Sequence, residues 1–384
     1  AFNETNEYGI TVELAENGMS YNDLREQMNA AIISGELPNL VAGYQSDALS
    51  YYLDDGALDL TPLLNDATFG YSEDELASLN MGIIQLNVFE EEGGVMLGWP
   101  NHVSASLQAV NLDMLAELGF AGAPETYEDF MAISCAAAEL ENVGGYPLTT
   151  SPNEFENFVA ARGGVLFADG KWDFTSEAAV AALQMYADLY SQGCAYIPED
   201  QYGNTADFSD LLNPMAQTST AGIPYILGDM QTNKDESGVE IPNWTIATVP
   251  WTDDNRMAQI YVQDIIVVPA TPEEEVASWL FLKFLTLAEN QIAWTQATSY
   301  FPINLDAAAN LADFEAANPY FAAAKAIVAD PNIKVYGSPQ VISYNAVRGI
   351  MSEGIADVTS NGRDVMDVAQ EMTDKANEAH ADLQ

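Results

Sequence analysis

Residues 99–113 read WPNHVSASLQAVNLD, and they stand between two stretches that follow the same order of signals. Before them, Ser20 followed by Asp23 is typical of a capped helix start, and residues 40–42 form a short apolar run that ends at Gly43. After them, Thr126 followed by Asp129 marks another capped helix. Helix starts that alternate with short apolar runs predict an α/β fold.

The alternation continues along the chain. Further predicted elements are a strand at 9–14, a helix from Ser176, strands at 244–249 and 258–268, a helix from Thr271-Pro272, and a C-terminal helix through 365–372. Because a strand, helix and strand joined by short links favour a parallel sheet, we expect mainly parallel sheets flanked by helices.

Composition narrows the class of protein. The chain has 384 residues, of which 48% are hydrophobic, so it can bury a core in each of two lobes. It carries 58 acidic against 11 basic residues, a net charge of -47, which repels nucleic acid and anionic membranes. This charge is compatible with a saline source or with an ordinary acidic secreted protein. No run of 18 apolar residues predicts a membrane span.

The sequence offers little for catalysis. It has two histidines, no nucleophile, phosphate-loop or metal motif, and no carboxylate in a clearly apolar context. We expect His380 to lie on the surface, whereas His102 either lines a site or is structural. The pattern therefore favours binding over catalysis.

Four segment ends carry polar and aromatic side chains. These are residues 43–47, 99–101, 218–225 and 299–302. Aromatic faces and planar amides suit ligands that present C–H surfaces and hydroxyl groups, as carbohydrates do. Any single aromatic residue there could belong to the core, but the set indicates a binding site.

The order of these motifs resembles family 1 of the extracellular solute-binding proteins of ABC importers, the sugar and glycerol-phosphate receptors. The matching positions are Asn111, Asp113, Thr126, Phe130, Arg162-Gly163-Gly164, Tyr300-Phe301-Pro302 and Val347-Arg348. The chain departs from the family where Ala109-Val110 replaces a Tyr pair, Tyr127 replaces a Trp, and Val262-Gln263 replaces a Gly-Gly. These departures indicate a reshaped pocket.

The resemblance implies a two-lobed fold of type II, with the solute held in a cleft by hinge closure. The expected lobes are 1–108 with 265–320 and 109–264 with 321–384, and a first βα unit would precede residue 1. The implied role is an extracytoplasmic receptor in the periplasm or at the cell surface, either free or held by a lipid anchor. It would be a monomer that serves membrane permease subunits, with no cofactor.

The same resemblance suggests which side chains face the cleft. We expect these to be Tyr44, Gln45, Asn101, Ser104, Ser219, Tyr225, Tyr261, Tyr300 and Arg348. Arg348 resembles the position that holds phosphate in glycerol-phosphate receptors, although pairing with Glu353 or Asp357 is an alternative. Arg162 is expected to order the loop that follows it.

The two cysteines, Cys135 and Cys194, are either separate buried thiols or one disulfide. Because the resemblance implies export, we favour the disulfide. Two other functions stay open: a hydrolase with a carboxylate pair, and an acidic surface protein used for adhesion or as a scaffold.

Overall fold

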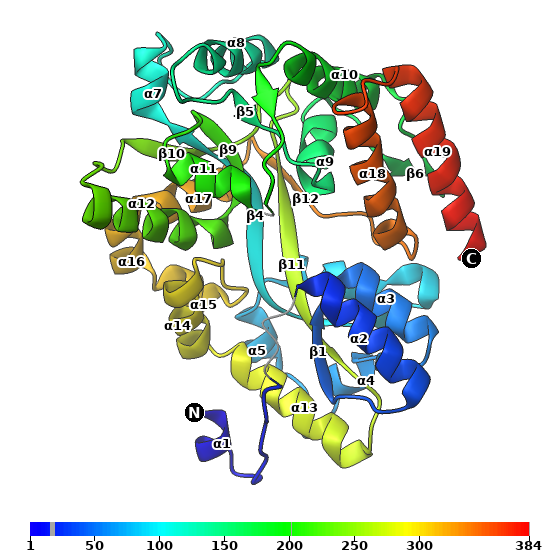
Figure 1. Cartoon of the computed structure of the whole chain (residues 1–384). Helices are drawn as coiled ribbons and strands as arrows, with labels where there is room; N and C mark the ends of the chain where they lie inside the picture. The colour runs from blue at the N-terminus through cyan, green and yellow to red at the C-terminus, as the bar shows by residue number, and fades with distance from the viewer. Residues whose placement is uncertain (16–19, 201, 384) are drawn as a thin grey trace. The chain divides into compact units, whose positions relative to one another are not determined.

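The computed structural model describes residues 1–15, 20–200 and 202–383. The chain forms two compact units. Unit 1 comprises Ala1–Val103, Val262–Phe314 and Gln340–Ile342, and unit 2 comprises Ser104–Tyr261, Glu315–Pro339 and Ser343–Gln384. Three elements contain a boundary between the units: β4 (Trp99–Asn111), β11 (Met257–Val267) and α16 (Ala312–Ala317) (Figure 1).

Unit 1 contains short helices and a small sheet. Its helices are α1 (Phe2–Thr5), α2 (Tyr21–Ser34), α3 (Gln45–Leu53), α4 (Thr61–Leu64), α5 (Glu73–Ala77), α6 (Met81–Ile84), α13 (Pro272–Leu285), α14 (Ala288–Thr298) and α15 (Leu305–Ala309), with 3₁₀ turns at Gln85–Asn87 and Glu90–Glu92. Its own strands are β1 (Leu40–Gly43), β2 (Val88–Phe89) and β3 (Val95–Met96).

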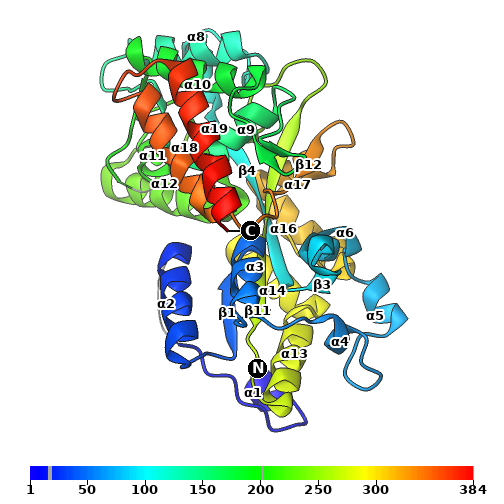
Figure 2. The same cartoon turned by 90° about the vertical axis from the view of Figure 1, so that its right-hand side faces the viewer.

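Unit 2 is the more helical unit. Its helices are α7 (Leu112–Glu117), α8 (Tyr127–Ala138), α9 (Pro152–Ala160), α10 (Glu177–Ser191), α11 (Gly203–Ser209), α12 (Ile223–Ser237), α17 (Pro319–Ala329), α18 (Tyr344–Val358) and α19 (Val365–Asp382), with a 3₁₀ turn at Thr220–Gly222. Its strands are β5 (Tyr146–Pro147), β6 (Phe167–Ala168), β7 (Lys171–Trp172), β8 (Ala195–Tyr196), β9 (Met215–Ser219), β10 (Trp244–Ala247) and β12 (Lys334–Tyr336). Figures 1 and 2 show α18 and α19 side by side.

The predicted helix starts are confirmed. Ser20 and Thr271 each form a capping box with the residue three positions later. The Thr126 and Ser176 side chains accept a hydrogen bond from a backbone amide in the first turn. At the end of α2, Gly35 takes the left-handed conformation, with φ 76°.

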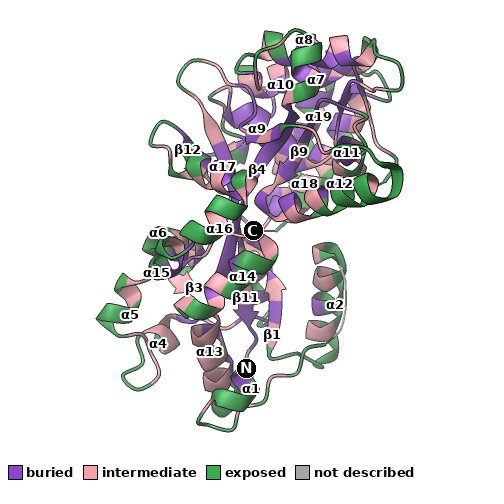
Figure 3. Cartoon of the chain, turned by 90° about the vertical axis from the view of Figure 1, so that its left-hand side faces the viewer, coloured by how far each residue is buried: buried purple, intermediate pink, exposed green. Residues whose placement is uncertain are grey.

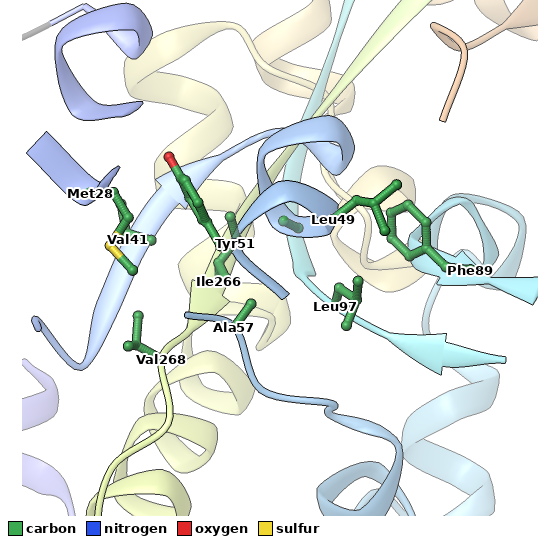
Figure 4. Packing of buried hydrophobic residues seen from close by; sticks show 10 residues of the cluster. Met28, Val41, Leu49, Tyr51, Ala57, Phe89, Leu97, Ile266 and Val268 are labelled. Carbon is green, nitrogen blue, oxygen red and sulfur yellow. The ribbon is translucent and has the colours of Figure 1, made fainter. Parts of the chain in front are cut away.

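Each unit has its own core. In unit 1, Figure 4 shows Met28 of α2, Val41 of β1 and Tyr51 of α3 packed around Ile266 of β11. Apart from Met28, α2 is exposed or half-buried along its length (Figure 3). In unit 2, Phe158 of α9 contacts Phe130 and Tyr186, and all three side chains are fully buried.

Residues 9–14 are not the strand that we expected. The Asn6 side chain donates to the carbonyl of Ile10 and accepts from its amide, both at 2.8–2.9 Å, and Asn3 does the same for Val12 at 2.9 Å. These two amide side chains occupy the backbone groups that a neighbouring strand would otherwise bind.

Strand directions also differ from the expectation. Parallel pairing is found for β11 with β12 and for β5 with β8. In contrast, β1 pairs antiparallel with β11, and β4 pairs antiparallel with β9 and with β10. The parallel expectation came from the order strand, helix, strand at the start of the chain, and the first of those strands does not form.

Residues 99–101, which we had placed at the end of a segment, are instead the start of β4, a strand of 13 residues that are all buried. The sequence did not indicate this strand because it contains polar side chains, whose burial depends on hydrogen-bond partners that are distant in sequence. Gln108, for example, donates to the Tyr146 hydroxyl at 3.0 Å.

His380 is buried rather than on the surface. Its side chain is 7% exposed, and its Nδ1 lies 3.0 Å from the Ser343 hydroxyl, which also accepts a hydrogen bond from the Trp172 indole at 3.0 Å. Cys135 and Cys194 form a disulfide, which ties α8 to the residue preceding β8.

Candidate functional site

Helix α9 carries two carboxylates into the core of unit 2. All of its residues except Asn153 are buried, and Glu154 and Glu156 are 0% and 5% exposed. A buried carboxylate needs hydrogen bonds or an opposite charge. We had found no carboxylate in an apolar context, and Glu154 and Glu156, on either side of Phe155, correct that statement.

Glu156 is the centre of a polar group. It accepts hydrogen bonds from the Tyr344 hydroxyl at 2.8 Å and from the Gln259 side chain. Both of these partners also contact the Ser338 hydroxyl, at 2.8 and 3.1 Å. Burial raises the pKa of Glu156, and the charge of Arg348 opposes that rise.

Arg348 lies one turn after Tyr344 on α18. Its Nη1 donates to Asn153 Oδ1 at 2.5 Å and to the Tyr344 hydroxyl at 3.2 Å. Burial acts to lower the pKa of Arg348, but Tyr344 and Glu156 outweigh it and raise that pKa. The guanidinium therefore keeps its charge in this group.

The alternative partners that we considered for Arg348 are otherwise engaged. Glu353 lies 3.8 Å from Lys375, and Asp357 pairs with Arg363 at 2.6 Å. The expected role of Arg162, to order the loop that follows it, stays a prediction. Its guanidinium lies 3.4 Å from the centre of the Tyr127 ring, and it donates to the Phe158 carbonyl at 3.0 Å.

Two tyrosines complete the group. Tyr261 donates to the side-chain Oε1 of Gln259 at 3.1 Å, and Tyr336 donates to Asn157 Oδ1 at 3.1 Å. Burial raises the pKa of both, so both remain neutral hydroxyls near neutral pH.

These side chains form what we call the Glu156 cluster. Its members are Asn153, Glu156, Gln259, Tyr261, Tyr336, Ser338, Tyr344 and Arg348. Five of them are half-buried: Asn153, Tyr261, Tyr336, Ser338 and Arg348. The buried members fix the positions of hydrogen-bond donors and acceptors, and the half-buried members make these groups accessible to a small polar molecule.

Unit 1 holds four of the predicted site residues. Gln45 Nε2 contacts Asn87 Oδ1 at 3.1 Å, the Val262 carbonyl at 3.1 Å and Asp264 Oδ2 at 2.8 Å. Tyr44 caps α3, and its ring centre lies 4.7 Å from that of Tyr21.

Asn101 and Tyr300 of unit 1 both contact His102. The Asn101 amide lies 2.9 Å from His102 Nδ1, and the Tyr300 ring centre lies 4.0 Å from that of the imidazole. Burial lowers the pKa of His102 to about 3, so the imidazole is neutral.

Unit 2 holds the other five predicted residues, of which only Tyr261 and Arg348 belong to the Glu156 cluster. Ser104 is buried within β4, Ser219 is the last residue of β9, and Tyr225 is 75% exposed on α12. Sequence reasoning missed the other cluster members. The detectable signal was the pair of carboxylates within the apolar segment 152–160.

No metal centre is indicated in the described ranges, where no group of three His, Cys, Asp or Glu residues could hold an ion. Nor does any helix in those ranges combine the length and hydropathy needed to cross a bilayer.

A family comparison decides the class of the protein. The sequence model of the family described as bacterial extracellular solute-binding protein matches residues 1–325. The chain belongs to this family. Family membership places the protein outside the cytoplasm and among binding proteins. No curated protein sequence matches the chain.

Solved structures agree on the fold, which is that of two-lobed α/β solute-binding proteins. UgpB from Mycobacterium tuberculosis, in complex with glycerophosphocholine, is 18% identical with a TM-score of 0.80, over 97% of this chain and 91% of that one. Maltose-bound MalE3 from T. maritima is 18% identical with a TM-score of 0.75, over 93% and 88%. The maltotriose-binding protein of Thermus thermophilus is 19% identical with a TM-score of 0.72, over 98% and 94%.

Proposed function

We propose that this protein is the substrate-binding receptor of an ABC importer and that the Glu156 cluster binds a neutral sugar or oligosaccharide. The solute is bound and delivered to the permease without chemical change. Family membership supports the transport role. The presence of one basic and one acidic side chain, Arg348 and Glu156, in the same cluster is the observation that favours a neutral solute.

The cluster suits hydroxyl groups for a physical reason. Its carboxylate accepts hydrogen bonds, its guanidinium donates them, and its tyrosines and serine do both. The cluster side chains are hydrogen-bonded to one another, so they lose little conformational entropy when a solute binds. Half-buried tyrosine rings add apolar area for the C–H faces of a sugar.

A glycerophosphate-type solute is the second candidate, favoured by Arg348 itself. Only its Nη1 has hydrogen-bond partners among the described residues, so its other N–H groups are available to a phosphate oxygen. An anionic ligand would also gain from protonation of Glu156, whose pKa is raised.

Thermal unfolding with a ligand panel tests the proposal. The panel holds maltose, maltotriose, monosaccharides, glycerol 3-phosphate and glycerophosphocholine. A ligand at 100 times its Kd adds about 2.7 kcal/mol to the unfolding free energy. We expect a selective shift by a neutral sugar. A shift by the phosphate compounds alone would support the second candidate, and no shift with any compound would contradict both.

A further inference from the structure

The second carboxylate of α9, Glu154, lies deeper than the Glu156 cluster. It is 0% exposed. Its Oε1 accepts a hydrogen bond from the Tyr146 hydroxyl of β5, which itself accepts one from Gln108 at 3.0 Å. Its Oε2 accepts from the Thr149 hydroxyl at 2.9 Å and from the Thr149 amide at 3.4 Å.

These bonds fasten the segment that leads into α9. Thr149 lies just before the helix start at Pro152, and Glu154 lies in its first turn. Between them is Asn153, whose Oδ1 accepts from Arg348 at 2.5 Å. Glu154 therefore holds the backbone on both sides of a residue that orients the guanidinium of the proposed site.

We propose that Glu154 is a positioning residue for solute binding: as a carboxylate it fixes residues 149–153 and keeps Asn153 against Arg348, and as a carboxylic acid it releases them. This inference rests on the proposed function, because it assigns a second, buried residue to the same site.

Protonation breaks this arrangement for a stereochemical reason. A carboxylate only accepts hydrogen bonds, and both oxygens of Glu154 already receive hydrogens. A proton on Oε2 turns that atom into a donor toward the Thr149 hydroxyl, which must then turn round to accept it. The neutral oxygen is also a weaker acceptor than a carboxylate oxygen, so the hydrogen bond from the Thr149 amide, already long at 3.4 Å, is weakened.

The change falls in the physiological range of pH. Burial raises the pKa of Glu154 to about 7, against the hydrogen bonds from Tyr146 and Thr149, which lower it. The nearby titratable groups on other elements are neutral hydroxyls at this pH, since the pKa of Tyr146, Tyr186 and Tyr261 is raised by burial.

Two charges lie further out. The charge of Arg162 lowers the pKa of Tyr186, whereas the neighbouring Tyr127 raises it. Arg348 interacts with Glu156, which raises the pKa of the guanidinium.

Hydrogen exchange without ligand tests whether the protonation of Glu154 controls residues 149–153. Exchange of residues 146–153 is compared at pH 6, 7 and 8 in the wild type, Glu154→Gln and Glu177→Gln, after correction for intrinsic rates. We expect protection to fall roughly threefold to tenfold from pH 8 to pH 6 in the wild type, because the protonated fraction of one group with a pKa of about 7 rises about tenfold over this range. The exposed Glu177 control keeps this pH dependence, and Glu154→Gln loses it.

A second variant guards against loss of folding in Glu154→Gln. Thr149→Val removes a hydrogen bond to the ionised form, so its transition moves to higher pH. An unchanged pH profile in Glu154→Gln, or in Thr149→Val if the first variant is unfolded, overturns the inference.

Binding of maltose by calorimetry provides the second arm. In the wild type, the Kd is expected to rise when the pH is lowered from 8 to 6, because protonated Glu154 no longer fixes residues 149–153. In Glu154→Gln, the Kd is expected to stay constant over this range. If maltose binds neither the wild type nor the variants while exchange shows the expected pH dependence, the proposed function is contradicted. The control of residues 149–153 by Glu154 is then still supported. If maltose binds with the same pH dependence in both proteins, the inference is wrong.

Discussion

Removal of the disulfide between Cys135 and Cys194 should destabilise unit 2 strongly. The two residues are 59 positions apart, and the bond restricts that loop in the unfolded chain. In the chain-entropy model a loop of this length corresponds to about 4 kcal/mol of stability at 25 °C. For a unit of roughly 200 residues, 1 kcal/mol shifts the Tm by about 2–4 °C, so a loss of about 8–16 °C is expected.

Differential scanning calorimetry of the Cys135→Ser/Cys194→Ser double variant measures this shift. Reduction of the wild type should give a shift of the same sign, and the double variant should not respond to the reductant. Unit 1 contains no cysteine, so it serves as an internal control.

Hydrogen exchange assigns the loss to a unit. Faster exchange is expected in α8, which contains Cys135, and in β8, which directly follows Cys194, with unchanged exchange in β1 and α3 of unit 1. A Tm shift below about 2 °C, or equal loss of protection in both units, would refute the reasoning from loop closure.

Two further predictions concern single side chains. Burial and the charge of Asp47 raise the pKa of Asp264. The wild type therefore loses stability as the pH rises above the pKa of about 4 that Asp264 has in the unfolded chain. The stability that Asp264→Asn gains over the wild type, measured by urea unfolding, should be larger at pH 8 than at pH 5. Arg162→Lys should cost about 1–2 kcal/mol by losing its contact with Tyr127. Arg363→Lys, in an exposed ion pair, should cost clearly less in the same assay. Equal costs for the two Arg variants, or a pH-independent effect at Asp264, would contradict these assignments.

Local signals in the sequence predicted local structure well. The caps of α2, α8, α10 and α13 depend on residues three positions apart, so their pattern can be read directly. Strand pairing depends on distant partners. Residues 9–14 alternate like a strand, but the side chains of Asn3 and Asn6 bind their backbone instead.

The candidate site was harder to predict for the same reason. Tyr261 and Arg348 could be proposed from the resemblance, yet the residues that hold them, Gln259 and Glu156, come from β11 and α9. Such polar contacts depend on tertiary packing, which no local spacing encodes. His380 shows the same limit, because its burial depends on a partner, Ser343, that lies 37 residues away.

Calorimetric titration of the sugar found in the panel tests the central claim most directly. The wild type is compared with Arg348→Ala, from the Glu156 cluster, and Tyr225→Ala, from the exposed face of α12. A charged hydrogen-bonding group contributes about 1.5–3 kcal/mol, so Arg348→Ala should weaken binding roughly 10- to 100-fold. Tyr225→Ala should leave the Kd within about threefold. Unchanged affinity in Arg348→Ala, with a large loss in Tyr225→Ala, would contradict the proposed site.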